Sequence, residues 1–191
     1  MARPREFDEE QVIGSAREAF WSNGFHDTSI TDLSAATGLS VGSIYKAFGS
    51  KADLCARTLD DYLEFGLVTV RELLDQPGSP VEGIERWLGW IAELASGDGP
   101  TRGCYAVALT SELAATDEAI RRRLQRHDDR ILGLLADAIR AANASGELRG
   151  DPQIGARLLT AAANGVQLEA RKGIDRSAAD ATLRLALDAL R

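Results

Sequence analysis

The chain has 191 residues, of which 45% are hydrophobic and 27% are charged, and its formal net charge is −7. These proportions are ordinary for a soluble globular protein with a sizeable core, and the negative charge argues against indiscriminate binding to nucleic acid. The sequence contains no run of 18 apolar residues that would span a membrane, and its first residues lack the apolar core of a signal peptide. We therefore expect no membrane association and a cytoplasmic location.

Catalytic and metal-binding patterns are not found in the sequence. Cys55 and Cys104 are far apart and are not in metal-ligand spacing, and the chain has only two histidines. We see no glycine-rich phosphate loop and no nucleophile elbow. Paired acids such as Asp60 and Asp61 are adjacent, so on a helix their side chains diverge. We expect no metal, no cofactor and no enzymatic activity.

Alanine and leucine dominate and no strand-like alternation persists, which predicts an all-α fold of about nine helices. The first helix is expected to begin after Asp8 and to end near Asn23, with Gly24 closing it. A loose arm that contains Arg3 and Arg5 precedes it.

Residues 28–51 read TSITDLSAATGLSVGSIYKAFGSK, which predicts two short helices joined by a tight turn. Ser29 and Asp32 have the spacing of a capping box, and Gly38 supplies the left-handed residue that ends the first of these helices. Ser40 is expected to cap the second helix, whose outward positions are small or polar and include no acid. Two helices around such a turn form a helix-turn-helix, which reads DNA in many proteins but also occurs as a plain helical corner.

The remaining helices follow from their start and stop signals. A long helix is expected from Ser50 to about Asp75, and the next begins at Ser79 and Pro80. Shorter and longer helices then span residues 104–115, 117–145 and 152–173, and a last helix runs to Leu190. Thr116 is the expected cap of the helix at residues 117–145, and Ser177 is the expected cap of the last helix. We expect the arginine-rich run from Arg121 to Arg130 to pair with Asp128 and Asp129.

The segments GLSVGSIYKAFGSKADL and AFWSNGFHDTSITDLSAATG resemble the signature of the TetR family over about the first 55 residues. The resemblance implies a helix-turn-helix DNA-binding domain at residues 1–52 and a ligand-binding and dimerisation domain at residues 53–191. It implies that phosphates are contacted by Thr28, Ser29, Thr31, Tyr45 and Lys51. It places near base edges Ser40, Val41, Gly42, Ser43 and Lys46, although the family often has His or an aromatic residue where Lys46 stands.

The resemblance also implies a cavity for a small-molecule effector in the second domain. Aromatic and polar residues beyond a minimal core are the candidates to line it: Tyr62, Phe65, Trp87, Trp90, Arg102, Cys104, Tyr105, Asn164 and Gln167. Each is also compatible with plain packing or with the surface. Cys104, at a helix N-terminus, is either a reactive thiol or a packing residue. The apolar bias of the set favours a hydrophobic effector.

The two C-terminal helices combine small residues with leucines, which suits a four-helix bundle with a second copy of the chain or an intramolecular pair. In TetR-like proteins this pair forms the dimer. The sequence therefore predicts a homodimeric, ligand-responsive regulator, by resemblance a repressor, that binds a palindromic operator in double-stranded DNA. The alternative is an all-α protein-interaction adaptor or ligand-binding protein that no longer binds DNA, which the acidic N-terminal segment favours.

Overall fold

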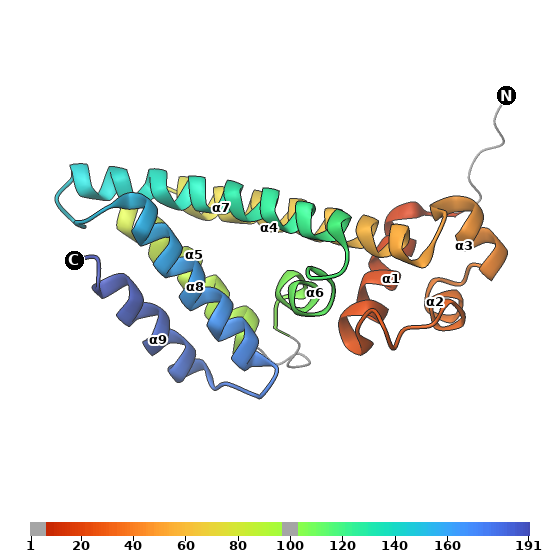
Figure 1. The fold of residues 1–191 in the computed structure, drawn as a ribbon. Coiled ribbons are helices and arrows are strands. Elements are labelled where there is room, and N and C mark those ends of the chain that lie inside the picture. The colour runs from red at the N-terminus through yellow and green to blue at the C-terminus, as the bar shows by residue number, and fades with distance from the viewer. Residues whose placement is uncertain (1–6, 97–102) are drawn as a thin grey trace, which may run out of the picture.

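The computed structural model describes residues 7–96 and 103–191, and within these residues it is all-α, as predicted. Arg3, Arg5 and Arg102 lie outside the described residues. The described chain forms nine helices (Figure 1): α1 Glu9–Asn23, α2 Ile30–Thr37, α3 Val41–Phe48, α4 Lys51–Asp75, α5 Pro80–Ser96, α6 Tyr105–Leu113, α7 Glu118–Ala144, α8 Pro152–Ala170 and α9 Arg176–Asp188.

Helices α1 to α3 form a small bundle at one end of an elongated molecule (Figure 1). The Ser29 side chain accepts a hydrogen bond from the Asp32 amide and the Asp32 carboxylate accepts one from the Ser29 amide, which completes the predicted capping box. Gly38 has a φ of 71° at the turn between α2 and α3, a conformation that costs glycine little because it has no Cβ. The helix-turn-helix is thus present where the capping pattern predicted it.

Helices α4 and α7 run side by side and carry the chain from this bundle to the opposite end (Figure 1). The arginines of α7 do not pair with Asp128 and Asp129, so that prediction was wrong. Arg123 instead pairs with Asp60 of α4 at 2.9 Å, and Arg130 approaches Glu64 of α4 at 3.4 Å. These bridges cross between the two helices because the arginines face α4.

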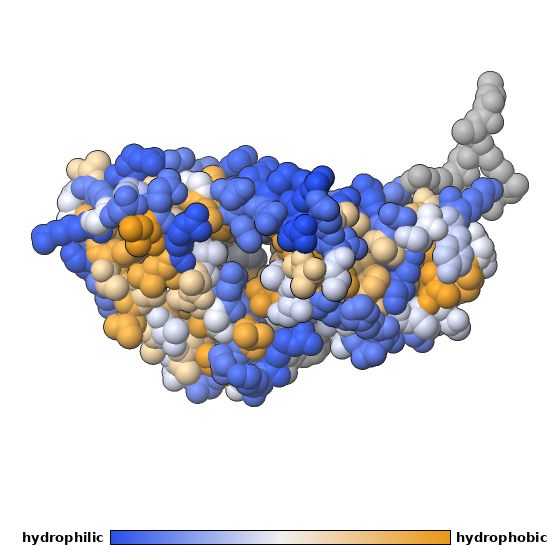
Figure 2. Space-filling model, in the orientation of Figure 1, coloured by the Kyte–Doolittle hydropathy of each residue, from blue (hydrophilic) through white to orange (hydrophobic). Residues whose placement is uncertain are grey.

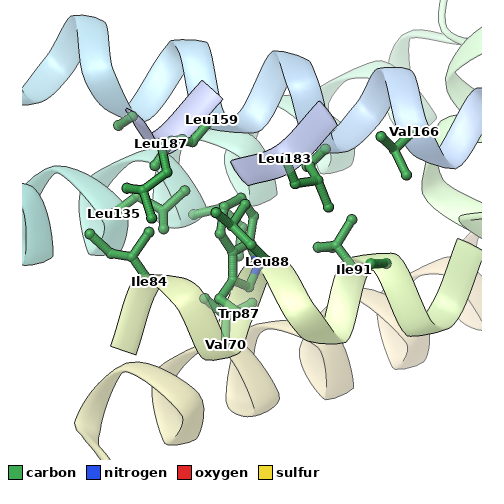
Figure 3. Packing of buried hydrophobic residues seen from close by; sticks show 14 of the residues in the cluster. Val70, Ile84, Trp87, Leu88, Ile91, Leu135, Leu159, Val166, Leu183 and Leu187 are labelled. Carbon is green, nitrogen blue, oxygen red and sulfur yellow. The ribbon is translucent and has the colours of Figure 1, made fainter. Parts of the chain in front are cut away.

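The C-terminal bundle is built around α5, which packs against α4, α7, α8 and α9. Figure 3 shows the side chains of Ile84, Leu88 and Ile91 on α5 extending toward leucines of α8 and α9. Trp87 lies among them and is 3% exposed. Burial of large apolar side chains, at roughly 1.5–3 kcal/mol each, is the main stabilisation of such a bundle.

Two of the helix starts differ from the prediction by one or two residues. The cap of α7 is Asp117 rather than Thr116, and its carboxylate accepts from the Ile120 amide at 3.0 Å. The cap of α9 is Asp175 rather than Ser177. In each case a hydroxyl residue lies one or two positions from the aspartate, and the carboxylate takes the capping position.

The predicted boundary near residue 52 does not coincide with a gap in the packing. One apolar cluster joins Phe20, Leu33 and Ile44 of the N-terminal bundle to α4, α6 and the first turns of α7. The boundary therefore remains a prediction. The N-terminal bundle packs against α4 and α6 through this cluster. No helix within the described residues is long and apolar enough to cross a membrane.

Candidate DNA-binding surface and ligand cavity

Helix α3 presents one face to solvent and anchors the other in the bundle. Ile44 is fully buried, whereas Gly42, Tyr45 and Lys46 are exposed and Tyr45 keeps 47% of its surface accessible. Ser40 caps the helix by accepting a hydrogen bond from the Ser43 amide at 3.2 Å. Val41 and Ser43 are half-buried and flank this face. The predicted base-edge residues thus lie on or beside the exposed side of α3.

Gly42 is not required by the packing of the protein itself. A Cβ placed there would meet only the Ser40 hydroxyl, at 4.0 Å, and nothing else within that distance. A glycine on an exposed helix face costs about 1 kcal/mol relative to alanine, so its use here needs another reason. Close approach of a partner to this turn of the helix supplies one.

Two of the residues predicted to contact phosphate are engaged inside the protein. Thr28 is fully buried, and its hydroxyl donates to the Gly24 carbonyl at 2.6 Å, so its side chain is not available at the surface. The Lys51 ammonium donates to the carbonyls of Phe25 and Thr28 at 2.7 and 2.8 Å and lies 4.2 Å from the Phe25 ring centroid. Thr28 and Lys51 therefore hold the turn before α2 against α4.

Ser29 and Thr31 lie at the start of α2 and are exposed. The Ser29 hydroxyl donates to the Asp32 carboxylate at 2.6 Å and accepts from the Asp32 amide at 3.1 Å. Helix N-termini attract phosphate through their backbone N–H groups and the helix dipole. The start of α2 therefore stays a candidate phosphate site.

A cavity of about 460 Å³ lies between α1, α4, α5, α6, α7 and α8. Most of the predicted ligand-binding residues line it: Tyr62, Phe65, Trp87, Trp90, Cys104, Asn164 and Gln167. Tyr105 does not. It is fully buried, and its hydroxyl is hydrogen-bonded to Thr58 at 2.9 Å, so it is a core residue of α6, and burial raises the pKa of its phenol.

The sequence analysis missed the lining residues that come from α1 and α7. Arg17 and Trp21 of α1 reach the cavity, as do His127 and Asp128 of α7. The sequence could have indicated Trp21 as a lining residue, because this large apolar side chain lies off the buried stripe of α1 formed by Val12, Ala16 and Phe20. The contribution of Arg17 could not be found from spacing alone, since its partner is Asp61 on α4, at 2.5 Å.

Aromatic side chains connect the cavity wall to the DNA-binding bundle. The Trp21 ring lies 5.3 Å from that of Tyr62 and 5.7 Å from that of Tyr105. Tyr62 also donates a hydrogen bond to the Cys104 sulfur at 3.4 Å. Burial and the neighbouring sulfur raise the pKa of Tyr62, so its hydroxyl keeps its proton and remains a donor at neutral pH.

Helix α6 is attached to the DNA-binding bundle at its other end. The Glu112 carboxylate accepts hydrogen bonds from the backbone amides of Phe25 at 3.0 Å and His26 at 2.8 Å, in the turn between α1 and α2. Cys104, at the start of the same helix, lines the cavity. A single short helix thus touches both the cavity and the turn that precedes the helix-turn-helix.

Helices α8 and α9 leave an apolar stripe uncovered. Ile154, Leu158 and Leu168 recur on one face of α8 with 69%, 39% and 47% of their surface exposed, and Leu185 of α9 is 72% exposed. Figure 2 shows apolar residues at this end of the molecule. Large exposed apolar residues gathered on one face are typical of a protein interface.

Comparisons with known proteins agree with this geometry. The family model described as bacterial regulatory proteins, tetR family, matches residues 12–58, and the model described as Tetracyclin repressor-like, C-terminal domain, matches residues 82–186. The chain belongs to the TetR family. The family comprises DNA-binding regulators, which confirms the resemblance and the prediction of a regulator rather than an enzyme.

Relatives with known names give the same result. The chain is 28% identical to the uncharacterized HTH-type transcriptional regulator YezE of Bacillus subtilis, over 79% of this chain and 78% of that protein. It is 32% identical to the HTH-type transcriptional repressor BdcR of Escherichia coli, over 55% of this chain and 53% of that protein. A CifR cysteine mutant in complex with 26-bp double-strand operator DNA has a TM-score of 0.86 and 27% identity, and the match covers 100% of both chains.

Proposed function

We propose that the protein is a homodimeric repressor that binds a palindromic operator and is released by a small molecule in the cavity. The observation that carries this proposal is the exposed face of α3, which lacks acids although the whole chain is acidic. The similarity to operator-bound CifR over the full chain supports it. As a transcriptional regulator that binds operator DNA, the protein would act in the cytoplasm.

In the proposed complex, α3 of each protomer enters the major groove. Ser40, Gly42 and Lys46 approach base edges, with Val41 and Ser43 beside them, while Tyr45 and the start of α2 at Ser29 and Thr31 contact phosphates. Phosphate contacts fix the register and base contacts provide specificity. Half-sites of a helix-turn-helix dimer lie about 34–36 Å apart, so the spacing of the two α3 helices decides affinity.

The second protomer is proposed to pack against the stripe on α8 and α9. The stripe offers apolar side chains that the monomer leaves in water, and the last two helices of two chains would form a four-helix bundle. Such an interface lies at the end of the molecule away from α3 (Figure 1). Any change in the angle between the bundle and the rest of the chain would then be amplified at α3.

Ligand release is proposed to act through α1 and α6. A ligand in the cavity contacts Trp21 of α1 and Cys104 of α6, and Glu112 ties α6 to the turn after α1. A ligand that favours a shifted α6 would move the DNA-binding bundle. By linkage, operator DNA weakens ligand binding by the same factor by which the ligand weakens operator binding.

Selection of bound sequences from a random duplex pool by the purified protein tests this function. The expected result is one palindrome with half-sites about one helical turn apart. A folded protein that enriches no sequence would contradict the proposal and would favour the adaptor interpretation.

Replacement of Tyr45 by alanine is expected to weaken binding to all DNA sequences alike. Loss of a hydrogen bond to a charged phosphate costs about 1.5–3 kcal/mol for each protomer. Tyr45 is 47% exposed and lies outside the apolar cluster of the bundle, so its replacement should change stability little. Fluorescence anisotropy with operator and random duplexes measures the change, and circular dichroism checks helicity. Tyr45→Phe keeps the ring and removes only the hydroxyl, so it distinguishes the effect of the hydrogen bond from the effect of ring packing. Unchanged operator affinity in Tyr45→Ala rules out the assigned role.

A further inference from the structure

The cavity wall carries one carboxylate that is not neutralised by a basic side chain of the described residues. Arg17 and Asp61 pair with each other at 2.5 Å. Asp128 also lines the cavity, and it forms no ion pair among residues 7–96 and 103–191. His127 beside it adds no positive charge at neutral pH, because burial and the nearby Arg130 lower its pKa. The described lining therefore has a net negative charge.

The same wall holds a buried hydrogen-bond acceptor without a donor. Gln167 is 3% exposed, and its amide nitrogen donates to the Ile91 carbonyl at 3.0 Å. Its Oε1 atom is buried and has no hydrogen-bond partner in the structure, and neither has the Thr160 hydroxyl. Buried polar atoms are nearly always paired in proteins. A ligand that brings an N–H or O–H group into the cavity would satisfy the Gln167 oxygen.

Aromatic rings form much of the remaining wall. All three tryptophans of the chain line the cavity, together with Tyr62 and Phe65. The faces of such rings attract cations as well as apolar groups, most strongly for tryptophan. The rings can therefore interact favourably with both the charge and the apolar part of an organic cation.

An anionic ligand is less well matched, even though the Arg17 Nε atom lies buried without a partner. The Arg17 charge is already balanced by Asp61, so an anion that accepted from this Nε–H would add an unbalanced negative charge to the wall. It would also meet the Asp128 carboxylate, and two negative charges repel each other.

We propose that the ligand of this cavity is a hydrophobic organic cation, with its ammonium group at Asp128 and its apolar part between the aromatic rings. The proposal rests on the proposed ligand response and specifies its chemical class. Asp128 lies at the rim of the cavity and is exposed to water, so its attraction for the cation is screened and its contribution is moderate.

Three probes that share one carbon skeleton test the preference for charge: 4-phenylbutylamine, 4-phenylbutanol and 4-phenylbutyrate. Binding is followed by tryptophan fluorescence of the full-length protein, since all three tryptophans report on the cavity. The amine is expected to bind about tenfold more tightly than the alcohol, and the butyrate is expected to bind most weakly. An amine that does not bind, or binds no better than the alcohol, overturns the proposal.

Asp128→Asn tests the assigned carboxylate, and Asp129→Asn is its matched control, because Asp129 is adjacent and exposed but does not line the cavity. Asp128→Asn is expected to weaken amine binding about fivefold and to leave alcohol binding unchanged, which also shows that the cavity is intact. Equal effects of the two variants overturn the role of Asp128. Release of operator by the alcohol as readily as by the amine would keep the proposed ligand response and overturn the charge preference.

Discussion

Replacement of both Ile154 and Leu185 by aspartate is expected to yield a monomer that binds operator 100- to 10,000-fold more weakly, by the usual gain from linked binding modules. Both side chains are largely exposed in the single chain, at 69% and 72%. The monomer therefore loses little packing when they are replaced. In a dimer the carboxylates would be buried in an apolar interface without partners, which is strongly unfavourable.

Analytical ultracentrifugation checks the mass, which should fall from twice 20.5 kDa to 20.5 kDa, and fluorescence anisotropy checks operator binding. Val68→Asp is the matched control, because Val68 is 47% exposed on α4, outside the α8–α9 stripe. It should leave both measurements unchanged. If the double variant remains a dimer, the interface lies elsewhere and the role of α8 and α9 is disproved.

The helices were predictable because their signals are local. Ser29, Ser40 and Ser50 cap α2, α3 and α4 as expected, and the hydroxyl of each accepts a hydrogen bond from the amide three residues later. Such bonds depend on a few neighbouring residues, which the sequence displays directly. Where an aspartate lies beside a threonine or near a serine, as at Asp117 and Asp175, both can cap, and the sequence alone does not choose.

The site was predicted less completely because its residues meet over long sequence distances. Arg17 reaches the cavity by pairing with Asp61, 44 residues later, and no periodicity encodes that contact. Thr28 and Lys51 were assigned to phosphates from the family signature, which records residue types but not the direction of a side chain. Their hydrogen bonds to backbone carbonyls inside the bundle are visible only in three dimensions.

The contact between the start of α6 and α8 leads to a second large expected effect, on stability. Gly103 has a φ of 61°, and a Cβ placed on it would lie 2.1 Å from the backbone oxygen of Gln167. The neighbouring atom belongs to a helix backbone and cannot rotate away. Gly103→Ala is therefore expected to force α6 away from α8 and to lower the free energy of unfolding by about 3 kcal/mol, measured by urea denaturation.

Gly146→Ala isolates the part of this loss that comes from the backbone conformation alone. Gly146 has a φ of 78°, and a Cβ there would meet nothing within 4 Å, so its replacement should cost only about 1 kcal/mol of conformational strain. Equal losses in the two variants would mean that the close approach of α6 to α8 is unimportant. A larger loss of unfolding free energy in Gly103→Ala, together with altered ligand binding in the cavity, would show that this contact holds Gln167 in place. The reason is that the clashing oxygen belongs to Gln167, whose side-chain amide lines the cavity.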